Sequence, residues 1–120
     1  MRRFLSITLA AGIAAPLAAC GGAPKPEARM ASSEGAIRGA REAGADNVPQ
    51  ATLYLKLAEE ERQKGLEYVK DDDNHKATMM LARSEADAEL AVALARQASA
   101  QNTANQATEQ LQDLKSKAAQ

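Results

Sequence analysis

The strongest constraint on this fold is the stretch from His75 to Lys117, which contains no glycine and no proline. Alanine is its commonest residue, and alanine has the highest intrinsic helix propensity. At ~1.5 Å per residue, one unbroken helix over this range would be about 60 Å long. The sequence therefore predicts an all-α fold built around one long helix.

Two apolar stripes follow this predicted helix, and both have heptad spacing. The first stripe consists of Ala77, Leu81, Ser84, Ala88, Ala91, Ala95 and Ala98. The second stripe consists of Met79, Ala86, Leu90, Ala93, Ala100, Ala104, Ala107, Leu111, Leu114 and Ala118, with Arg83 and Gln97 as off-pattern steps. Beyond Ala98 the first stripe becomes polar at Asn102 and Asn105. We expect the front of the helix to be packed on two sides, and the remainder on one side or none.

Two shorter helices are predicted before the long one. The first begins near Glu27 and has a weak stripe of Met30, Ser33, Ile37, Ala40 and Gly44. After a break at 45–49, the second runs from about Pro49 to Val69. Its stripe consists of Ala51, Leu55, Ala58, Arg62, Gly65 and Val69, and is widened by Leu53, Tyr54 and Leu57.

An acidic turn at 71–74 joins the second and third helices, which predicts an antiparallel hairpin. Asp73 or Asn74 is the expected N-cap of the third helix. Counting outward from the turn brings Gly65 near Met80, where small residues allow a close approach. The same count brings Arg62 near Arg83 and Ala58 near Asp87, so Glu59 with Arg83 and Arg62 with Asp87 are candidate ion pairs across the hairpin.

The predicted fold is thus a short first helix plus an antiparallel helical hairpin with a long, partly protruding third helix. Residues 28–98 are expected to form an alanine-rich three-helix domain. Residues 99–120 are expected to form a polar helical tail with a coiled-coil-like stripe.

The N-terminus has the three-part layout of an export signal. Arg2 and Arg3 precede an apolar run, and Leu17-Ala18-Ala19-Cys20-Gly21 resembles a bacterial lipobox. We expect a lipoprotein signal peptide at 1–19, then the lipidated Cys20 within a flexible tether at 20–27. Two or three acyl chains on Cys20 would anchor the protein stably, whereas one chain binds only marginally.

The alternative is an ordinary cleaved signal with an incidental cysteine. A twin-arginine route is disfavoured because the Ser/Thr before the arginines and the spacer before Phe4 are missing. Gly21 stands where an aspartate would be the usual signal for retention at the inner membrane. We therefore expect an outer-membrane anchor, with the protein facing the periplasm.

Composition excludes several function classes. The chain has 15 Lys and Arg against 16 Asp and Glu, and the signal removes two arginines, so the mature charge is −3. This charge gives no footprint for nucleic acid. Tyr54 and Tyr68 are the only aromatic residues left after the signal, so stacking platforms and pocket walls are scarce. No cofactor is expected.

Catalytic and metal sites are not expected either. The acidic turn lacks the Gly and Glu of a calcium loop at Lys76 and Ala82, and His75 has no second histidine. The run 59–61 is expected to be a solvated helix face, and Ser84 a small packing residue. Tyr54 and Tyr68 are interpreted as rim residues, with a partner surface as the alternative.

The stretch from Ile37 to Ala95 resembles the bacterial domain-of-unknown-function family 4398, small exported helical proteins that are often lipoproteins. The resemblance is carried by Ala43-Gly44-Ala45, Pro49, Leu55-x-Leu57-Ala58, the acidic turn, Ala77, Leu81-Ala82 and the run from Glu85 to Ala91. It implies an exported helical domain. The family has no assigned catalytic or binding residues to transfer.

The expected function is that of a lipid-anchored cell-envelope protein with a structural or adaptor role through helix–helix contacts, and without catalysis. The rival hypotheses are a module that binds a glycan or lipid in a groove between helices, and an enzyme. We expect the stripe at Leu111 and Leu114 either to fray or to bind a helical protein, which could be another envelope protein or a second copy.

Overall fold

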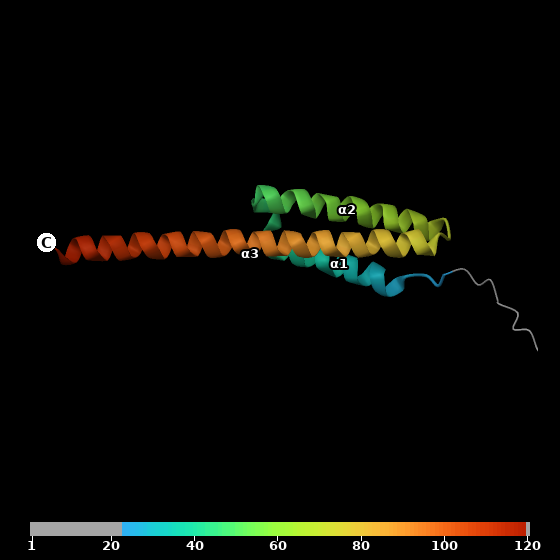
Figure 1. Cartoon of the computed structure of the whole chain (residues 1–120), viewed down its shortest axis with the longest axis horizontal. Helices are drawn as coiled ribbons and strands as arrows, with labels where there is room; N and C mark the ends of the chain where they lie inside the picture. Colours follow the sequence, from blue (N-terminus) through green and yellow to red (C-terminus); the bar gives the residue numbers. More distant parts are fainter. Residues whose placement is uncertain (1–22, 120) are drawn as a thin grey trace, which may run out of the picture.

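The computed structural model describes residues 23–119. The predicted signal peptide and Cys20 lie outside these residues. The elements are α1 (Glu27–Glu42), the short 3₁₀ helix η1 (Ala45–Asn47), α2 (Pro49–Lys70) and α3 (Asn74–Ala118) (Figure 1). The described residues contain no strand. The predicted fold class is confirmed, since α2 and α3 form an antiparallel hairpin and α3 continues well beyond it (Figure 1).

Local chemistry sets the ends of these helices. Gly44 follows α1 with φ 85°, a left-handed conformation in which a glycine costs little. Pro49 occupies the first turn of α2, where its missing N–H costs no hydrogen bond. The Asp73 carboxylate accepts the Lys76 backbone N–H at 3.2 Å and so caps α3, as predicted. The Asn74 side-chain amide donates to the Ala23 carbonyl at 2.8 Å, which holds the start of the described chain beside the turn.

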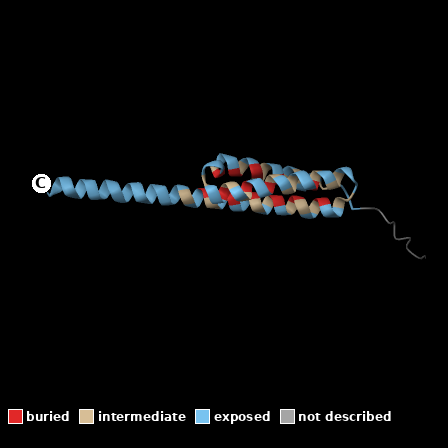
Figure 2. Ribbon diagram, turned by 90° about the horizontal axis from the view of Figure 1, so that it is seen from above, coloured by how far each residue is buried: buried red, intermediate tan, exposed pale blue. Residues whose placement is uncertain are grey.

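The core of the bundle is a seam of small residues where the three helices meet (Figure 2). Six residues of the first stripe, Ala77, Leu81, Ser84, Ala88, Ala91 and Ala95, are buried, as are the predicted stripe residues Ala51, Leu55, Ala58 and Gly65 of α2. α1 contributes Ser33, Ile37 and Ala40. Since alanine buries little area, stability depends on close backbone approach. One sign of that approach is the Ser84 hydroxyl, which donates to the Ala58 carbonyl across the hairpin at 2.7 Å.

Gly65 is the tightest point of the hairpin. A Cβ added at this position would lie 2.8 Å from Cγ and 2.9 Å from Cδ2 of Leu81. Leu81 is fully buried. The predicted close approach is confirmed, with Leu81 rather than the neighbouring Met80 as the contact residue.

The prediction that the front of α3 is packed along both of its stripes is wrong. Both α1 and α2 contact α3 along its first stripe, and the described residues of the second stripe are exposed along the whole helix. In a three-helix bundle each helix turns one stripe toward the shared axis, so burial of a second stripe would need a further helix. Leu53 and Leu57 of α2 are likewise exposed rather than part of the core.

The ion pairs also differ from the predicted ones. Glu59 pairs with Arg41 at 2.6 Å, and Arg62 pairs with Glu34 at 2.7 Å. Arg83 pairs with Glu61 at 3.1 Å. Counting from the turn considered only α2 and α3, whereas α1 supplies closer partners for both residues of α2.

From Ser99 to Ala119 every residue is exposed, and α3 remains helical to Ala118. The tail therefore protrudes as a single helix (Figure 2). Among the helices of residues 23–119, none combines the length and apolarity needed to cross a membrane.

Candidate functional site

The most prominent candidate site is the second stripe of α3. Its large members are exposed to a similar degree: Met79 54%, Leu90 39%, Leu111 52% and Leu114 66%. These four side chains are unevenly spaced but share one helix face, and exposed apolar side chains gathered on one face mark a candidate docking surface. The second stripe runs along the outer face of the hairpin and continues onto the uncovered tail.

Heptad positions show how this face is separated from the core. With Leu90 and Leu111 at position a and Leu114 at position d, the second stripe occupies a and d along α3. The buried residues of α3 then occupy b and f, on the other side of the helix. A partner on the second stripe would therefore not compete with α1 or α2.

The flanks of this stripe are charged with opposite signs at its two ends. Asp87 and Glu89 flank Leu90, whereas Lys115 and Lys117 flank Leu114; Lys117 also pairs with Asp113 within α3 at 2.6 Å. Asp87 lies beside Glu61 of α2. Burial raises the pKa of Glu61 and the negative charge of Asp87 raises it further, while Arg83 lowers it. Two carboxylates, Asp87 and Glu61, thus lie together near Leu90, with the Arg83 guanidinium 3.1 Å from Glu61.

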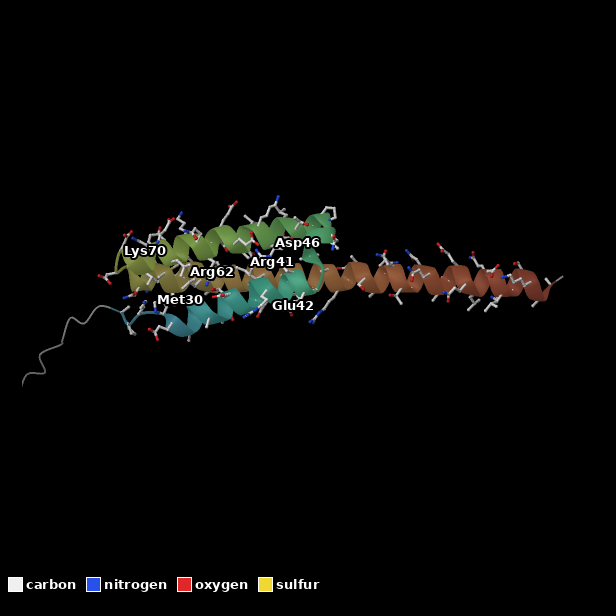
Figure 3. The ribbon with its side chains drawn as sticks, turned by 180° about the vertical axis from the view of Figure 1, so that it is seen from behind. Met30, Arg41, Glu42, Asp46, Arg62 and Lys70 are labelled. Atoms are coloured by element: carbon white, nitrogen blue, oxygen red, sulfur yellow. The ribbon has the colours of Figure 1, made fainter. Side chains whose placement is uncertain are left out.

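The second candidate is a groove between α1 and α2 with a volume of about 320 Å³. Figure 3 shows Arg41 of α1 and Arg62 of α2 on this side of the bundle. Its lining residues are Glu34, Ile37, Arg38, Arg41, Glu59, Arg62 and Gln63. Two of its three arginines are engaged in the pairs with Glu59 and Glu34, and the Nε atom of Arg62 is buried without a hydrogen-bond partner.

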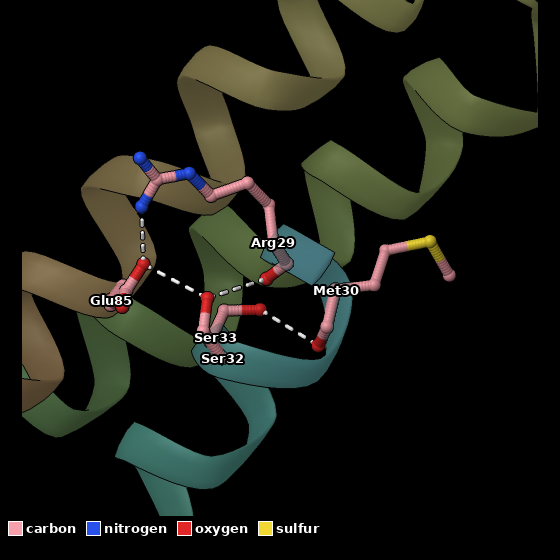
Figure 4. Close-up of polar contacts among 5 residues, drawn as sticks. All are labelled: Arg29, Met30, Ser32, Ser33 and Glu85. Atoms are coloured by element: carbon pink, nitrogen blue, oxygen red, sulfur yellow. Dashed lines mark hydrogen bonds and ion pairs between the residues drawn. The ribbon is translucent and has the colours of Figure 1, made fainter. Parts of the chain in front are cut away.

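A polar cluster between α1 and α3 is structural. The Arg29 guanidinium and the Ser32 hydroxyl both donate to one carboxylate oxygen of Glu85, at 2.7 Å and 2.9 Å (Figure 4). The Ser33 hydroxyl donates to the Met30 carbonyl within α1 (Figure 4). The two bonds to Glu85 join α1 to α3.

At the acidic turn, the Asp73 carboxylate lies 2.7 Å from Nζ of Lys76. Hydrogen bonds from Lys76 lower the pKa of Asp73, and the same contact raises the pKa of Lys76. Nζ of Lys76 also lies 5.5 Å from the centre of the Tyr68 ring, within cation–π range. Within residues 23–119 no three His, Cys, Asp or Glu side chains are placed to hold a metal ion.

The remaining predicted residues are scattered. Tyr54 and Tyr68 are half-buried at the edges of α2, Ser84 is buried in the hairpin, and Glu59–Glu61 divide between two ion pairs and solvent. Cys20 lies outside the described residues. The sequence did not predict the arginines of the α1–α2 groove, because it does not show that Arg38 and Arg41 of α1 lie beside Arg62 of α2.

Comparison with known proteins gives one match. A family model described as "Domain of unknown function (DUF4398)" matches residues 28–107, two thirds of the chain. Neither the curated proteins nor the solved structures contain a match.

Proposed function

Because the chain belongs to the DUF4398 family, a domain of unknown function, we propose its role from its own surfaces: a lipid-anchored cell-envelope protein with a structural or adaptor function through helix–helix contacts. The observation that carries this proposal is the second stripe of α3, whose leucines are exposed on a face of the helix that the rest of the described chain does not cover. A docking role accounts for an otherwise unfavourable exposure of leucine, at ~25 cal/mol per Å² of apolar surface.

The described chain starts at the opposite end of the molecule from the tail. Ala23 is hydrogen-bonded to Asn74 at the start of α3, and only Gly21 and Gly22 stand between it and Cys20 in the sequence. α3 contains 45 residues and is therefore about 67 Å long. A lipid on Cys20 would fix the bundle at a membrane while the tail reaches away from it or lies along it.

The localisation is proposed from the N-terminal residues alone. The lipobox resemblance around Cys20 supports lipidation, and Gly21 supports sorting to the outer membrane with the protein facing the periplasm. Mass spectrometry of the mature protein should show an N-terminal Cys20 with two or three acyl chains. Cys20→Ser should prevent lipidation and processing, and Gly21→Asp should move the protein to the inner membrane of a Gram-negative host. Normal processing of the serine variant would contradict the anchor.

Crosslinking in intact cells, followed by pulldown, tests the adaptor role. The double variant Leu111→Glu/Leu114→Glu should lose the crosslinked complexes and keep the bundle folded. Leu53→Glu is the matched control, since Leu53 is also 56% exposed but lies on α2. If the control loses the complexes and the double variant keeps them, the docking surface is on α2 and the proposal is wrong.

The α1–α2 groove favours one alternative, a module that holds an anionic glycan or lipid of the envelope. The specific observation is the set of three arginines beside Ile37. Arg38→Ala should weaken binding to vesicles containing anionic lipid, or to isolated cell-wall glycan, if this alternative holds. Binding that Arg38→Ala leaves unchanged would exclude the groove. No catalytic step is proposed for either surface.

A further inference from the structure

We propose that the second stripe of α3 binds the same stripe of a second copy of this chain, antiparallel, in the register that sets Leu90 of each copy opposite Leu114 of the other. This inference rests on the proposed function and names its partner. The tail of each copy would then lie along the outer face of the other copy's hairpin.

The register follows from the positions of the large side chains. In an antiparallel pair, a residues of one helix lie opposite d residues of the other. With Leu90 opposite Leu114, Leu111 lies opposite Ala93, Ala100 opposite Ala104, and Gln97 opposite Ala107. Large residues therefore contact each other or alanine, and the centre of the pair is alanine against alanine, which allows the helices to approach closely. Arg83 lies beyond the end of the partner helix.

Charge complementarity supports the same register. Glu89 and Lys117 occupy g positions, which face each other in an antiparallel pair, and Asp87 and Lys115 occupy the facing e positions. Glu89 of each copy faces Lys117 of the other, and Asp87 of each faces Lys115 of the other. Lys115 would thereby compensate the negative charge shared by Asp87 and Glu61.

Neighbouring registers lose these matches. A shift of one heptad toward the N-terminal end sets Leu114 opposite Arg83 and leaves both lysines opposite uncharged residues. A shift of one heptad the other way sets Leu114 opposite Gln97 and Lys117 opposite Arg96, a like-charge contact.

A parallel, in-register pair fits less well. It would set Arg83 against Arg83 and Gln97 against Gln97 within the apolar seam. Its g-to-e contacts would pair Glu89 with Leu94 and Lys115 with Gln110, so neither charge would find a partner of opposite sign. The tail of each copy would also stay uncovered by the partner's hairpin.

Variants of the full chain with one cysteine added to Cys20 distinguish these arrangements. Thr103 occupies the g position at the centre of the antiparallel pair and faces its own copy, so Thr103→Cys should give a crosslinked dimer with a short bis-maleimide. Asn102→Cys is the matched control, because Asn102 has the same height on the helix but lies at f, away from the seam. Leu111→Cys should give no dimer, because the two copies of Leu111 would be ~27 Å apart at ~1.5 Å rise per residue.

Charge exchange tests the register independently. Glu89→Lys and Lys117→Glu should each weaken dimerisation about tenfold in sedimentation experiments, since each opposes like charges at two symmetric places. The double variant should restore wild-type association. Because Glu89 and Lys117 are 28 residues apart on one helix, only contact between copies can couple them.

The outcomes separate this inference from the proposed function. Crosslinking of Leu111→Cys but not of Thr103→Cys would establish a parallel pair and overturn the inference. A chain that stays monomeric at tens of micromolar, with neither variant crosslinked, would overturn it as well. The adaptor role would survive either result if Leu111→Glu/Leu114→Glu still loses its complexes in cells. Crosslinking of the wild type through Cys20 would contradict the lipid anchor instead.

Discussion

A single methyl group at Gly65 should destabilise this bundle, although the same change elsewhere stabilises it. Gly65→Ala gains about 1 kcal/mol of helix propensity. The new Cβ would lie 2.8 Å from Cγ of Leu81, closer than carbon atoms pack. Leu81 is fully buried and its backbone N–H is also close, at 3.4 Å from that Cβ, so the side chain has little room to move. Overpacking of this kind costs about 1–3 kcal/mol, which exceeds the propensity gain.

The first helix supplies the matched controls. A Cβ at Gly35 or at Gly39 meets nothing within 4 Å. Gly35→Ala and Gly39→Ala should therefore each stabilise the bundle by up to about 1 kcal/mol. In a domain of this size, about 1 kcal/mol corresponds to a shift of about 4–8 °C in Tm.

Thermal and urea unfolding followed by far-UV circular dichroism would measure these changes, at one protein concentration so that association affects all variants alike. The substitutions Gly65→Ala and Leu81→Ala should also be coupled. Leu81→Ala alone should cost about 2–5 kcal/mol, and it should cost less in the Gly65→Ala background, where the added methyl group already fills part of the space. If Gly65→Ala raises Tm as much as Gly39→Ala does, the backbones of α2 and α3 do not approach at this point, and the packing argument is refuted.

Three other predictions concern charge and the tail. Leu111→Glu/Leu114→Glu should leave the unfolding midpoint of the monomeric bundle unchanged and abolish self-association; cooperative unfolding of the whole bundle by this variant would show that the tail belongs to the core. Asp73→Ala should lower Tm at neutral pH. Because the folded-state pKa of Asp73 is lowered, its contribution is present above its unfolded pKa and lost as pH falls through the folded value, so Asp73→Ala and wild type should converge in acid. Glu61 has a raised pKa, so its ionisation opposes folding at neutral pH; this penalty shrinks as pH falls through the folded value and is gone below the unfolded value. Glu61 therefore offsets part of the acid destabilisation in the wild type, and Glu61→Gln should steepen the upper part of the acid limb in the stability–pH profile.

The sequence predicts the helices well because their ends depend on neighbouring residues. Pro49 starts α2 and Asp73 caps α3, and both effects act within a few residues. Gly44 was expected within the stripe of the first helix, but it lies beyond α1 in a left-handed conformation. The buried stripes of all three helices were predicted for the same reason. Helical periodicity and residue size identify the face of a helix whose small and apolar side chains can be buried without burying a charge.

The choice between the two stripes of α3 could not be predicted in this way. Both have heptad spacing and both are mainly alanine, so each is fit for packing. The position of α1 decides which stripe is buried, because the short η1 link places α1 and α2 on the same side of α3. The ion pairs of Glu59 and Arg62 were mispredicted on the same account, since their partners come from α1. The heptad spacing of residues in α2 and α3 does not show where α1 packs.

The second stripe of α3 would let a chain this poor in large side chains fold alone and also pair with a second copy. The first stripe contains the small residues Ser84 and Ala88 between its leucine and alanine neighbours, and it lets three backbones pack closely. The second keeps leucines only near its C-terminal end and at Leu90, separated by alanines, so a single helix could not gain much by folding back on it. Two copies would align those leucines and the opposite charges beside them at once. Association should therefore be weak for the free chain and strengthened when a common membrane raises the local concentration, an expectation that comparison of dimer crosslinking for Cys20→Ser and wild-type protein in cells would check. Equal crosslinking of the two at equal expression would show that the anchor plays no part in pairing the helices.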